Sequence, residues 1–224
     1  MLIGIPAFNE EKMIGEVIKS LPKKIKGVSR IDILVVDDGS SDKTGIVAKK
    51  YKVKILQHII NRGLGGALKT IFAYAKMKSY DILVTFDADG QHNPKDLAKL
   101  TKPIIEGNSE IVIGTRWTNK NKVPLSRIII NKIANAVTYF LYGVMSTDSQ
   151  SGLRVFGKKA INTISLQNDG MEVSSEIFKE IHRNKLNFCE VPIIPVYTDY
   201  SISKGQRLSD APNIVIQLVI RLLS

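Results

Sequence analysis

The chain has 224 residues, of which 44% are hydrophobic and 24% charged, so it can bury a sizeable core but is too short for two full-sized domains. Lysine and arginine total 32 against 21 aspartate and glutamate, and the net charge of +11 favours phosphate-rich partners, without choosing between anionic lipid and nucleic acid. The single cysteine, Cys189, excludes an intramolecular disulfide framework and is expected to be a buried, inert thiol.

The first half of the sequence alternates short apolar runs with segments whose apolar residues recur at helical spacing. In chain order, we expect a strand at 2–5, a helix at 10–20, a strand at 31–36, a helix at 42–50, a strand at 53–57, a helix at 64–78, a strand at 82–86, a helix at 95–105 and a strand at 110–113. This alternation predicts an α/β fold with a Rossmann-like, mainly parallel sheet flanked by helices.

The pattern changes after Trp117, where a polar loop and Pro124 precede a long apolar helix at 128–145. A turn, a helix near 173–182 and a strand near 188–196 follow. No repeat or linker separates this second part, so we expect one domain over residues 1–224.

No stretch has the roughly 20 consecutive apolar residues that cross a bilayer, and the N-terminus does not resemble a secretory signal. Two interrupted apolar segments, 128–145 and 214–223, are instead expected to be amphipathic and to lie at a membrane interface. The first has a polar stripe formed by Arg127, Asn131 and Asn135. Its apolar face comprises Ile130, Ile133, Val137, Phe140 and Val144. The alternative is a helix buried in the core.

An acidic cluster, Asp87-Ala88-Asp89-Gly90-Gln91, directly follows the strand expected to end at Phe86. Two carboxylates two residues apart, with an amide oxygen just beyond, supply hard oxygen ligands for Mg²⁺ or Mn²⁺ and leave coordination positions for diphosphate oxygens. The alternative is an ordinary Asp-Gly turn, but such a turn needs no paired acids at a strand end.

Two further polar clusters follow predicted strands. Asp37 and Asp38 come after the strand at 31–36, where one carboxylate can accept hydrogen bonds from a nucleobase or ribose and Ser41 or Asp42 can cap the next helix. The third cluster, residues 6–11, follows the first strand. Since parallel strands end at the same sheet edge, we expect the three clusters to converge there.

Two apparent motifs are rejected. The glycines of residues 63–70 resemble a phosphate-binding loop, but Leu68 stands where the Walker pattern requires glycine, so a closely packed helix start is expected. His58, His92 and His182 lack metal-ligand spacing and are expected to have surface or loop roles.

Several motifs, in this order and spacing, resemble family 2 glycosyltransferases of the dolichyl-phosphate mannose synthase-like branch over nearly the whole chain. They are Pro6-Ala7-Phe8-Asn9-Glu10, residues 36–44, Asp87-Ala88-Asp89-Gly90-Gln91-His92, Gly114-Thr115-Arg116 and Ser151-Gly152-Leu153-Arg154. The resemblance implies a GT-A fold, with nucleotide-sugar and metal binding in residues 1–117 and acceptor binding, with the interfacial helices, in 118–224.

The same resemblance implies roles for individual residues. The nucleoside would be held by Pro6, Ala7, Asn9, Glu10 and Asp38. Asp87 would lie near the ribose and the Mg²⁺ or Mn²⁺ ion, whose direct ligands would be Asp89 and Gln91.

On the phosphate side, Arg116 would contact the donor diphosphate or the acceptor phosphate, and Arg127 with Asn131 matches positions that grip the lipid phosphate. Arg154 would offset further phosphate charge, and Lys204 would close over the diphosphate from a loop near the C-terminus. That loop departs from the family pattern because no arginine lies just upstream of Ser203; Arg207 is the candidate substitute.

The expected reaction is an inverting transfer from a nucleoside-diphosphate sugar to polyprenyl or dolichyl phosphate at the cytoplasmic face of a membrane, with the protein bound peripherally. Because the phosphate nucleophile is already anionic, no strong general base is needed. The unusual C-terminal loop ranks UDP-N-acetylglucosamine or UDP-glucose above GDP-mannose.

Two alternatives remain open. A family 2 enzyme with a soluble or polysaccharide acceptor would need a catalytic base such as Glu172. A non-catalytic, basic membrane- or nucleic-acid-binding protein would explain the net charge but not the acidic clusters, and no aromatic stacking module is present, so we expect no nucleic-acid partner.

Overall fold

A computed structural model describes residues 1–116 and 125–196 of the chain. Its strands are β1 Leu2–Ala7, β2 Asp32–Asp37, β3 Lys54–Gln57, β4 Ile82–Thr85, β5 Ile111–Thr115, β6 Arg154–Gly157 and β7 Phe188–Pro192. Its helices are α1 Ile14–Ser20, α2 Thr44–Lys49, α3 Gly63–Met77, the 3₁₀ turn η1 Pro94–Asp96, α4 Leu97–Ile105, α5 Leu125–Tyr142, α6 Lys158–Thr163 and α7 Val173–Arg183.

The strands form one seven-stranded sheet in the order β3-β2-β1-β4-β6-β5-β7. Neighbouring strands are parallel except for β6, which runs antiparallel to both β4 and β5. The predicted mainly parallel sheet is therefore confirmed. From β1 the chain builds outward through β2 and β3, then returns to the other side of β1 with β4. This places the switch point of the topology, where α/β sheets bind ligands, between β1 and β4.

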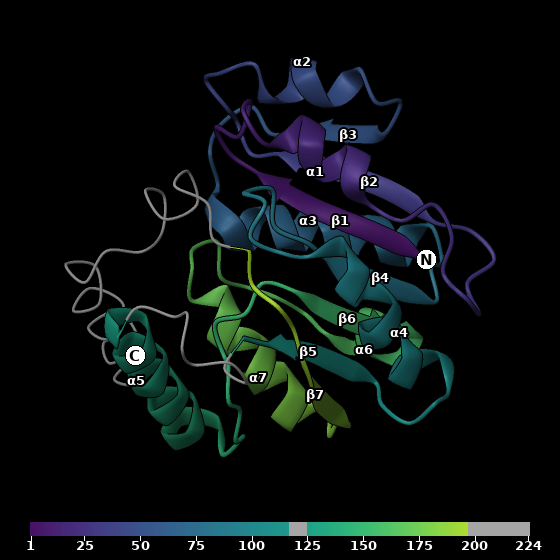
Figure 1. Ribbon diagram of the computed structural model, residues 1–224. Coiled ribbons are helices and arrows are strands. Elements are labelled where there is room, and N and C mark those ends of the chain that lie inside the picture. Colours follow the sequence, from purple (N-terminus) through teal and green to yellow (C-terminus); the bar gives the residue numbers. More distant parts are fainter. Residues whose placement is uncertain (117–124, 197–224) are drawn as a thin grey trace.

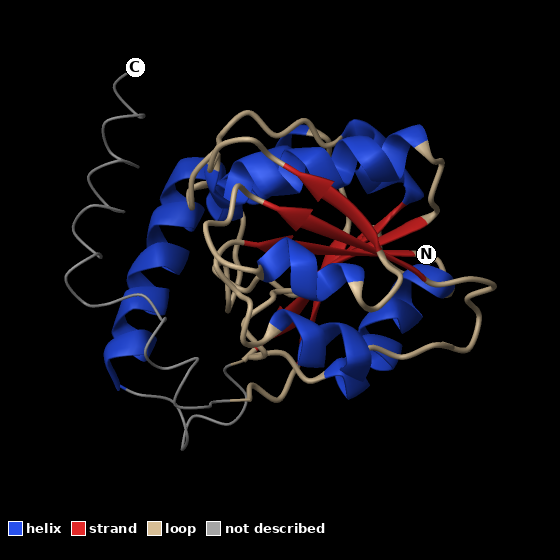
Figure 2. Ribbon diagram, turned by 90° about the horizontal axis from the view of Figure 1, so that it is seen from above, coloured by secondary structure: helices blue, strands red, loops and turns tan. Residues whose placement is uncertain are grey.

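Helices cover both faces of the sheet (Figures 1 and 2). Alternate residues of the central strands point to opposite faces, so Leu2 and Leu34 pack on one side and Ile3 and Val35 on the other. The first face is covered by α3, α6 and α7, and the second by α1, α2 and α4. Because central strands such as β1 and β5 are buried on both faces, they read as continuous apolar runs.

The main difference from the expected elements lies between residues 150 and 165, where neither β6 nor α6 was predicted. The strand is short and begins with a charged residue, Arg154, which is only 2% exposed. Cys189 also differs from expectation, because its side chain is half-buried rather than buried.

Helix α5 confirms the long helix predicted near 128–145, but it ends at Tyr142. Gly143, with φ of 67°, provides the left-handed residue that commonly terminates a helix. Val144 is buried in the core, so the predicted apolar face does not extend to it, whereas Ile133 and Phe140 are 43% and 85% exposed. No helix in the described ranges is long and apolar enough to span a bilayer.

Candidate active site

The polar clusters predicted to converge lie at the carboxyl edge of the sheet. The loops after β1 and β4 flank the switch point, and the loop after β2 adjoins β1. Because β6 is antiparallel to its neighbours, its first residue, and not its last, lies at this edge of the sheet. Arg154 therefore pairs with Thr85 at the end of β4 and lies opposite Ile113 near the end of β5.

The loop after β4 turns sharply at Gly90, where φ is 76°. Asp89 accepts hydrogen bonds from the backbone N–H of Gln91 at 2.9 Å and from its Nε2 at 2.8 Å. The turn brings His92 back to Asp87, with 2.8 Å between Nε2 and Oδ2. His92 is buried and packs edge-on against the ring of Phe86. His92 thus has the loop position that was expected, but it is buried instead of lying at the surface, and it holds one of the two acids in place.

The two acids of this loop have opposite electrostatic settings. Burial would raise the pKa of Asp87, but the charge of His92, their hydrogen bond, and the charges of Arg116 and Arg154 outweigh it, so this pKa is lowered. Burial and the charge of Asp87 together raise the pKa of Asp89 above its ordinary value. The edge therefore holds an acid pair whose mutual repulsion a cation would relieve.

The residues present fit a divalent cation of the hard, oxygen-seeking type. Asp87 and Asp89 supply carboxylate oxygens, and Gln91 supplies an amide oxygen when its side chain is turned toward the cation. Within residues 1–116 and 125–196, no group of three or more His, Cys, Asp or Glu side chains could hold a metal. A site with few protein ligands suits Mg²⁺ or Mn²⁺ shared with a diphosphate better than a closed structural zinc site.

The loops after β1 and β2 are joined to each other by hydrogen bonds. Asn9, which has a positive φ of 54°, accepts a hydrogen bond at Oδ1 from the N–H of Ser41 and donates its own N–H to Ser40 Oγ. The N–H of Glu10 donates to Thr44 Oγ1 at 2.8 Å. Of the predicted nucleoside-binding residues, Pro6 and Ala7 end β1, and Asn9 and Glu10 lie in the loop that follows it. Nucleoside contact itself stays a prediction.

Asp38, predicted to contact the nucleoside, is buried and accepts hydrogen bonds from its own chain. Its carboxylate receives the N–H groups of Arg62 and Gly63, the latter at 2.7 Å, and meets His58 Nδ1 at 2.6 Å. His58 lies in the loop after β3, which agrees with the expected surface or loop role, although its side chain is only 11% exposed. Asp38 thereby anchors the first turn of α3 at the sheet edge, and the expected close-packed helix start is confirmed, since a Cβ on Gly63 would lie 2.6 Å from the Asp169 carbonyl oxygen.

The expected cap of α2 by Ser41 or Asp42 is wrong, because the N-cap position is Lys43, which makes no side-chain cap hydrogen bond. Asp42, one residue earlier, accepts the N–H of Thr44 at Oδ1 at 2.9 Å and the N–H of Glu11 at Oδ2. One carboxylate thus contacts the start of α2 and ties the β2 loop to the β1 loop.

Two arginines reach this edge from β5 and β6. Arg116, just beyond β5, makes a two-pronged ion pair with Asp148: Nε to Oδ2 at 2.8 Å and Nη2 to Oδ1 at 2.7 Å. Arg154 donates Nη2 to the carbonyl oxygens of Ser149 and Ser174. Burial lowers the pKa of Arg154 to about 10, which still leaves its guanidinium charged at neutral pH. Both charges act on Asp87, so the structure brings predicted donor-side and phosphate-side residues together.

The predicted lipid-phosphate residues are placed only in part. Asn131 is buried in α5, and its Nδ2 donates to the carbonyl oxygen of Thr147 at 2.9 Å. Asn135, one turn along the same stripe, donates to the same oxygen at 2.8 Å. The stripe therefore faces the protein here. Arg127 belongs to α5, but its side chain, like all of Lys204, lies outside the described residues.

Residues 2–164 match the family described as Glycosyl transferase family 2. The chain belongs to this family. One family 2 relative, a UDP-N-acetylglucosamine–dolichyl-phosphate N-acetylglucosaminyltransferase of Methanococcus voltae, is 40% identical, with 90% of this chain and 87% of that protein covered. Another, a polyprenol monophosphomannose synthase of Mycolicibacterium smegmatis, is 29% identical, with 94% and 83% covered.

A solved structure supports the fold of this family 2 glycosyltransferase. Glucosyl-3-phosphoglycerate synthase of Mycobacterium tuberculosis, crystallised with Mn²⁺, UDP-glucose and phosphoglyceric acid, matches with a TM-score of 0.73 at 20% identity, covering 99% of this chain and 78% of that chain. The predicted GT-A fold is confirmed. Placement of amphipathic helices at a membrane stays a prediction.

Sequence reasoning missed three residues at the edge of the family 2 fold: His58, His92 and Asp148. Each pairs with a predicted site residue, namely Asp38, Asp87 and Arg116. His92 belongs to a quoted motif, so its place beside the acids was a usable signal. Asp148 lies 32 residues from its partner and gave no local signal.

Proposed function

We propose that this glycosyltransferase moves a sugar from a nucleoside diphosphate to polyprenyl or dolichyl phosphate, with inversion at the anomeric carbon. A phosphate oxygen of the lipid forms the new bond to that carbon. The bond to the donor's diphosphate breaks, and the departing nucleoside diphosphate keeps the electron pair. The observation that carries the proposal is that Arg116, just beyond β5, and Arg154, opposite the end of β4, lie at the sheet edge that also holds the Asp87 and Asp89 loop.

The side chains supply positioning and charge. Asp87, Asp89 and Gln91 would hold Mg²⁺ or Mn²⁺, which supplies positive charge to the leaving diphosphate when bound. Arg116 and Arg154 add fixed cationic charge where two phosphate groups must approach each other. Since an anionic phosphate attacks, the proposal assigns no general base.

For the donor, we propose a UDP-sugar, with UDP-N-acetylglucosamine first. The support is the Methanococcus voltae relative, whose name carries that donor and whose 40% identity exceeds the 29% of the mannose synthase relative. For the acceptor, both relatives are named for a lipid phosphate.

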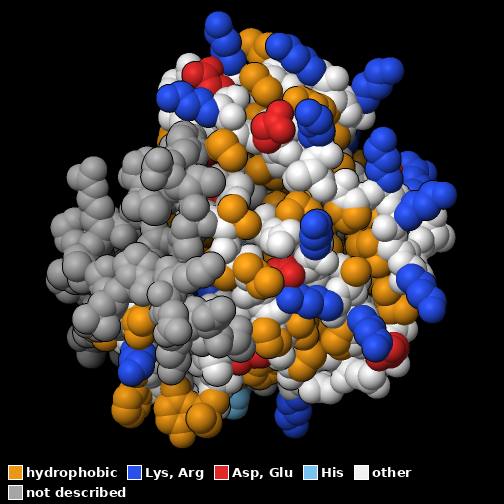
Figure 3. Space-filling model, viewed as in Figure 1, with side chains coloured by type: hydrophobic (Ala, Val, Ile, Leu, Met, Phe, Trp, Pro, Cys, Tyr) orange, Lys and Arg blue, Asp and Glu red, His pale blue; other side chains and the backbone are white. Residues whose placement is uncertain are grey.

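The lipid acceptor would place the enzyme peripherally at the cytoplasmic face of a membrane. On α5, Ile133, Tyr139 and Phe140 are 43%, 49% and 85% exposed, and Met145 just beyond is 78% exposed. Figure 3 shows apolar side chains gathered at the lower left, where Figure 1 places the end of α5. This group is where we propose the protein meets lipid.

A soluble acceptor is the second candidate, favoured by the fold match to a synthase crystallised with phosphoglyceric acid. It would call on a base such as Glu172, which lies directly before α7. Glu172→Gln separates the two: this variant should keep lipid-linked turnover and lose transfer to a soluble hydroxyl.

The test is incubation of the purified protein with Mn²⁺ or Mg²⁺, a short polyprenyl phosphate and, in separate tubes, UDP-N-acetylglucosamine, UDP-glucose or GDP-mannose, with lipid-linked sugar detected by mass. We expect product with one donor, and its loss on chelation and in Asp89→Asn. Glu180→Gln is the matched control, because Glu180 is a buried carboxylate on α7 that holds the Ser165 N–H. Slow donor hydrolysis without lipid product would refute the acceptor, and the absence of any nucleotide binding would refute the whole proposal.

A further inference from the structure

Residues 146–149, between α5 and β6, form a segment we call the Thr147 loop. It is held from three sides. Glu190 on β7 accepts hydrogen bonds from Ser146 Oγ at 2.6 Å and from the Thr147 N–H at 2.8 Å. From α5, Asn135 donates to the Thr147 carbonyl oxygen and accepts the N–H of Ser149 at 2.9 Å. The loop therefore has little freedom to move relative to β7 and α5.

The hydroxyl groups of the loop complete the arrangement. Thr147 Oγ1 donates to Glu190 Oε2 at 2.6 Å. The Thr147 hydroxyl has only this one proton to donate. In its 2.8 Å hydrogen bond with Thr115 Oγ1, Thr115 is therefore the donor. The end of β5 is thereby tied to the same loop, immediately before Arg116.

These contacts of the Thr147 loop fix the position of Asp148. Its side chain is fully buried, and both carboxylate oxygens face Arg116. Oδ2 also accepts the backbone N–H of Arg116 at 3.1 Å. The Arg116 side chain remains 21% exposed, so solvent reaches part of it while two of its nitrogens are held by Asp148.

We propose that Asp148 is a positioning residue that fixes the Arg116 guanidinium for the donor diphosphate. The donor, rather than the acceptor, is indicated because Arg116 follows β5 at the sheet edge that holds Asp87, the acid of the proposed metal and ribose site. The N–H of Gly114, near the end of β5, donates to the Leu153 carbonyl oxygen at 2.9 Å, and the adjacent Gly152 lies against the Asp87 carboxylate. This inference rests on the proposed function, in which Arg116 contacts a phosphate, and adds that this phosphate belongs to the donor diphosphate. A planar guanidinium held at two nitrogens presents its remaining N–H groups in one fixed direction, which suits two-pronged recognition of phosphate oxygens.

Asp148 is poorly placed for the alternative role of a general base. A base must accept a proton from the nucleophile, but the Asp148 side chain is fully buried and both of its oxygens already accept hydrogen bonds from Arg116. Its effect on the reaction therefore passes through Arg116, and this makes the proposal testable by a double-mutant cycle.

The cycle compares wild type, Asp148→Asn, Arg116→Ala and the double variant. Donor affinity is measured by calorimetry with Mn²⁺ and the nucleoside diphosphate, and steady-state constants are measured for donor and acceptor separately. We expect Asp148→Asn to lower kcat/KM for the donor by about 10- to 100-fold, the range seen when partners that orient active groups are removed. The KM for the lipid phosphate should stay within about 2-fold, and in the Arg116→Ala background the second change should add less than about 2-fold.

Two controls separate positioning from folding. Glu180→Gln removes another buried carboxylate, 2% exposed, and should lower the melting temperature without changing donor affinity. Arg116→Lys keeps the charge but cannot pair with both Asp148 oxygens, so it should reproduce the loss of donor affinity even where Asp148→Asn does not fold.

Each outcome has one meaning. Unchanged donor affinity in Asp148→Asn or Arg116→Lys overturns the proposal, as does an Asp148→Asn effect that multiplies fully with Arg116→Ala. Wild-type protein that binds the nucleotide but makes no lipid-linked sugar refutes the proposed acceptor. The calorimetric cycle then still decides the role of Asp148.

Discussion

Gly152, just before β6, lies against the side chain of Asp87. A Cβ at position 152 would lie 2.5 Å from Oδ1 of that carboxylate and still closer to Oδ2. Ordinary contact begins near 3.4 Å, so in Gly152→Ala the carboxylate must retreat by about 1 Å. An error of that size at a reacting site costs on the order of 100-fold in rate, so we expect kcat to fall about 100-fold.

The same change should leave stability nearly untouched. Moving Asp87 weakens its hydrogen bond with His92, which costs about 1 kcal/mol. Replacing glycine by alanine restricts the unfolded chain, which raises the free energy of unfolding by about 0.4–1 kcal/mol. Gly152 does not have a positive φ, so alanine adds no backbone strain there. The two effects nearly cancel, so the melting temperature should shift by less than about 4 °C.

Gly107→Ala is the matched control, because Gly107 has a φ of 73° and open space around its missing Cβ. It should lose about 1–2 kcal/mol of stability through backbone strain and keep full activity. Turnover by mass spectrometry and melting by circular dichroism measure both variants. Gly152→Ala with activity within about 2-fold of wild type would show that Asp87 does not need its present position, and a large loss of melting temperature would show that activity fell by unfolding.

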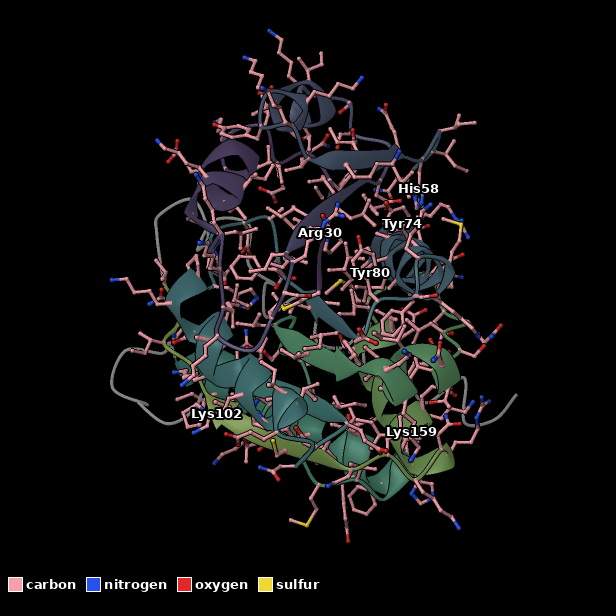
Figure 4. All side chains as sticks on the ribbon, turned by 90° about the vertical axis from the view of Figure 1, so that its right-hand side faces the viewer. Arg30, His58, Tyr74, Tyr80, Lys102 and Lys159 are labelled. Atoms are coloured by element: carbon pink, nitrogen blue, oxygen red, sulfur yellow. The ribbon has the colours of Figure 1, made fainter. Side chains whose placement is uncertain are left out.

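Three other perturbations follow from the structure. Tyr80, whose ring lies near that of Tyr74 (Figure 4), donates a hydrogen bond to Asp32 at 2.9 Å. Burial and this hydrogen bond raise the pKa of Tyr80 to about 12, so the stability that Tyr80 contributes is present below pH 10 and lost as pH rises toward 12. Tyr80→Phe should remove that loss in alkaline unfolding curves. Gly65→Ala would drive a Cβ into the carbonyl group of Asn168 and should lower the free energy of unfolding by about 1–3 kcal/mol, measured by urea unfolding. An unchanged free energy of unfolding would show that the loop containing Asn168 moves aside freely. Phe140→Ser, at an 85% exposed position, should leave melting unchanged but weaken sedimentation with anionic vesicles; equal sedimentation would place the membrane contact elsewhere.

The central parallel strands were predictable because strands such as β1 and β5 are buried on both faces and therefore read as apolar runs. β6 was missed for the opposite reason. It is four residues long and begins with Arg154, whose charge is satisfied by carbonyl oxygens from Ser149 and Ser174. A buried arginine is recognisable only when the groups around it are known.

The acids of the site were predictable because each follows a strand, but their partners were not. His92 reaches Asp87 only because Gly90 reverses the loop. Asp148 meets Arg116 because β5 and β6 are neighbours in the sheet, a consequence of one antiparallel strand in a parallel sequence pattern. The spacing of residues along the chain does not indicate either contact.

These partners share a physical feature that affects how the site should respond to mutation. Asp38, Asp87 and Arg116 are each oriented by side chains or backbone groups of the protein before any ligand is bound. Hydrogen bonds to charged groups each contribute about 1.5–3 kcal/mol to folding, but they also decide where a charge lies, and a charge in the wrong place lowers binding or rate. Substitutions in the orienting groups should therefore lower turnover by more than their effect on melting accounts for. If the melting temperature and the turnover of these variants fell in proportion, the contacts would serve mainly to stabilise the fold, and the substrate would position the reacting groups.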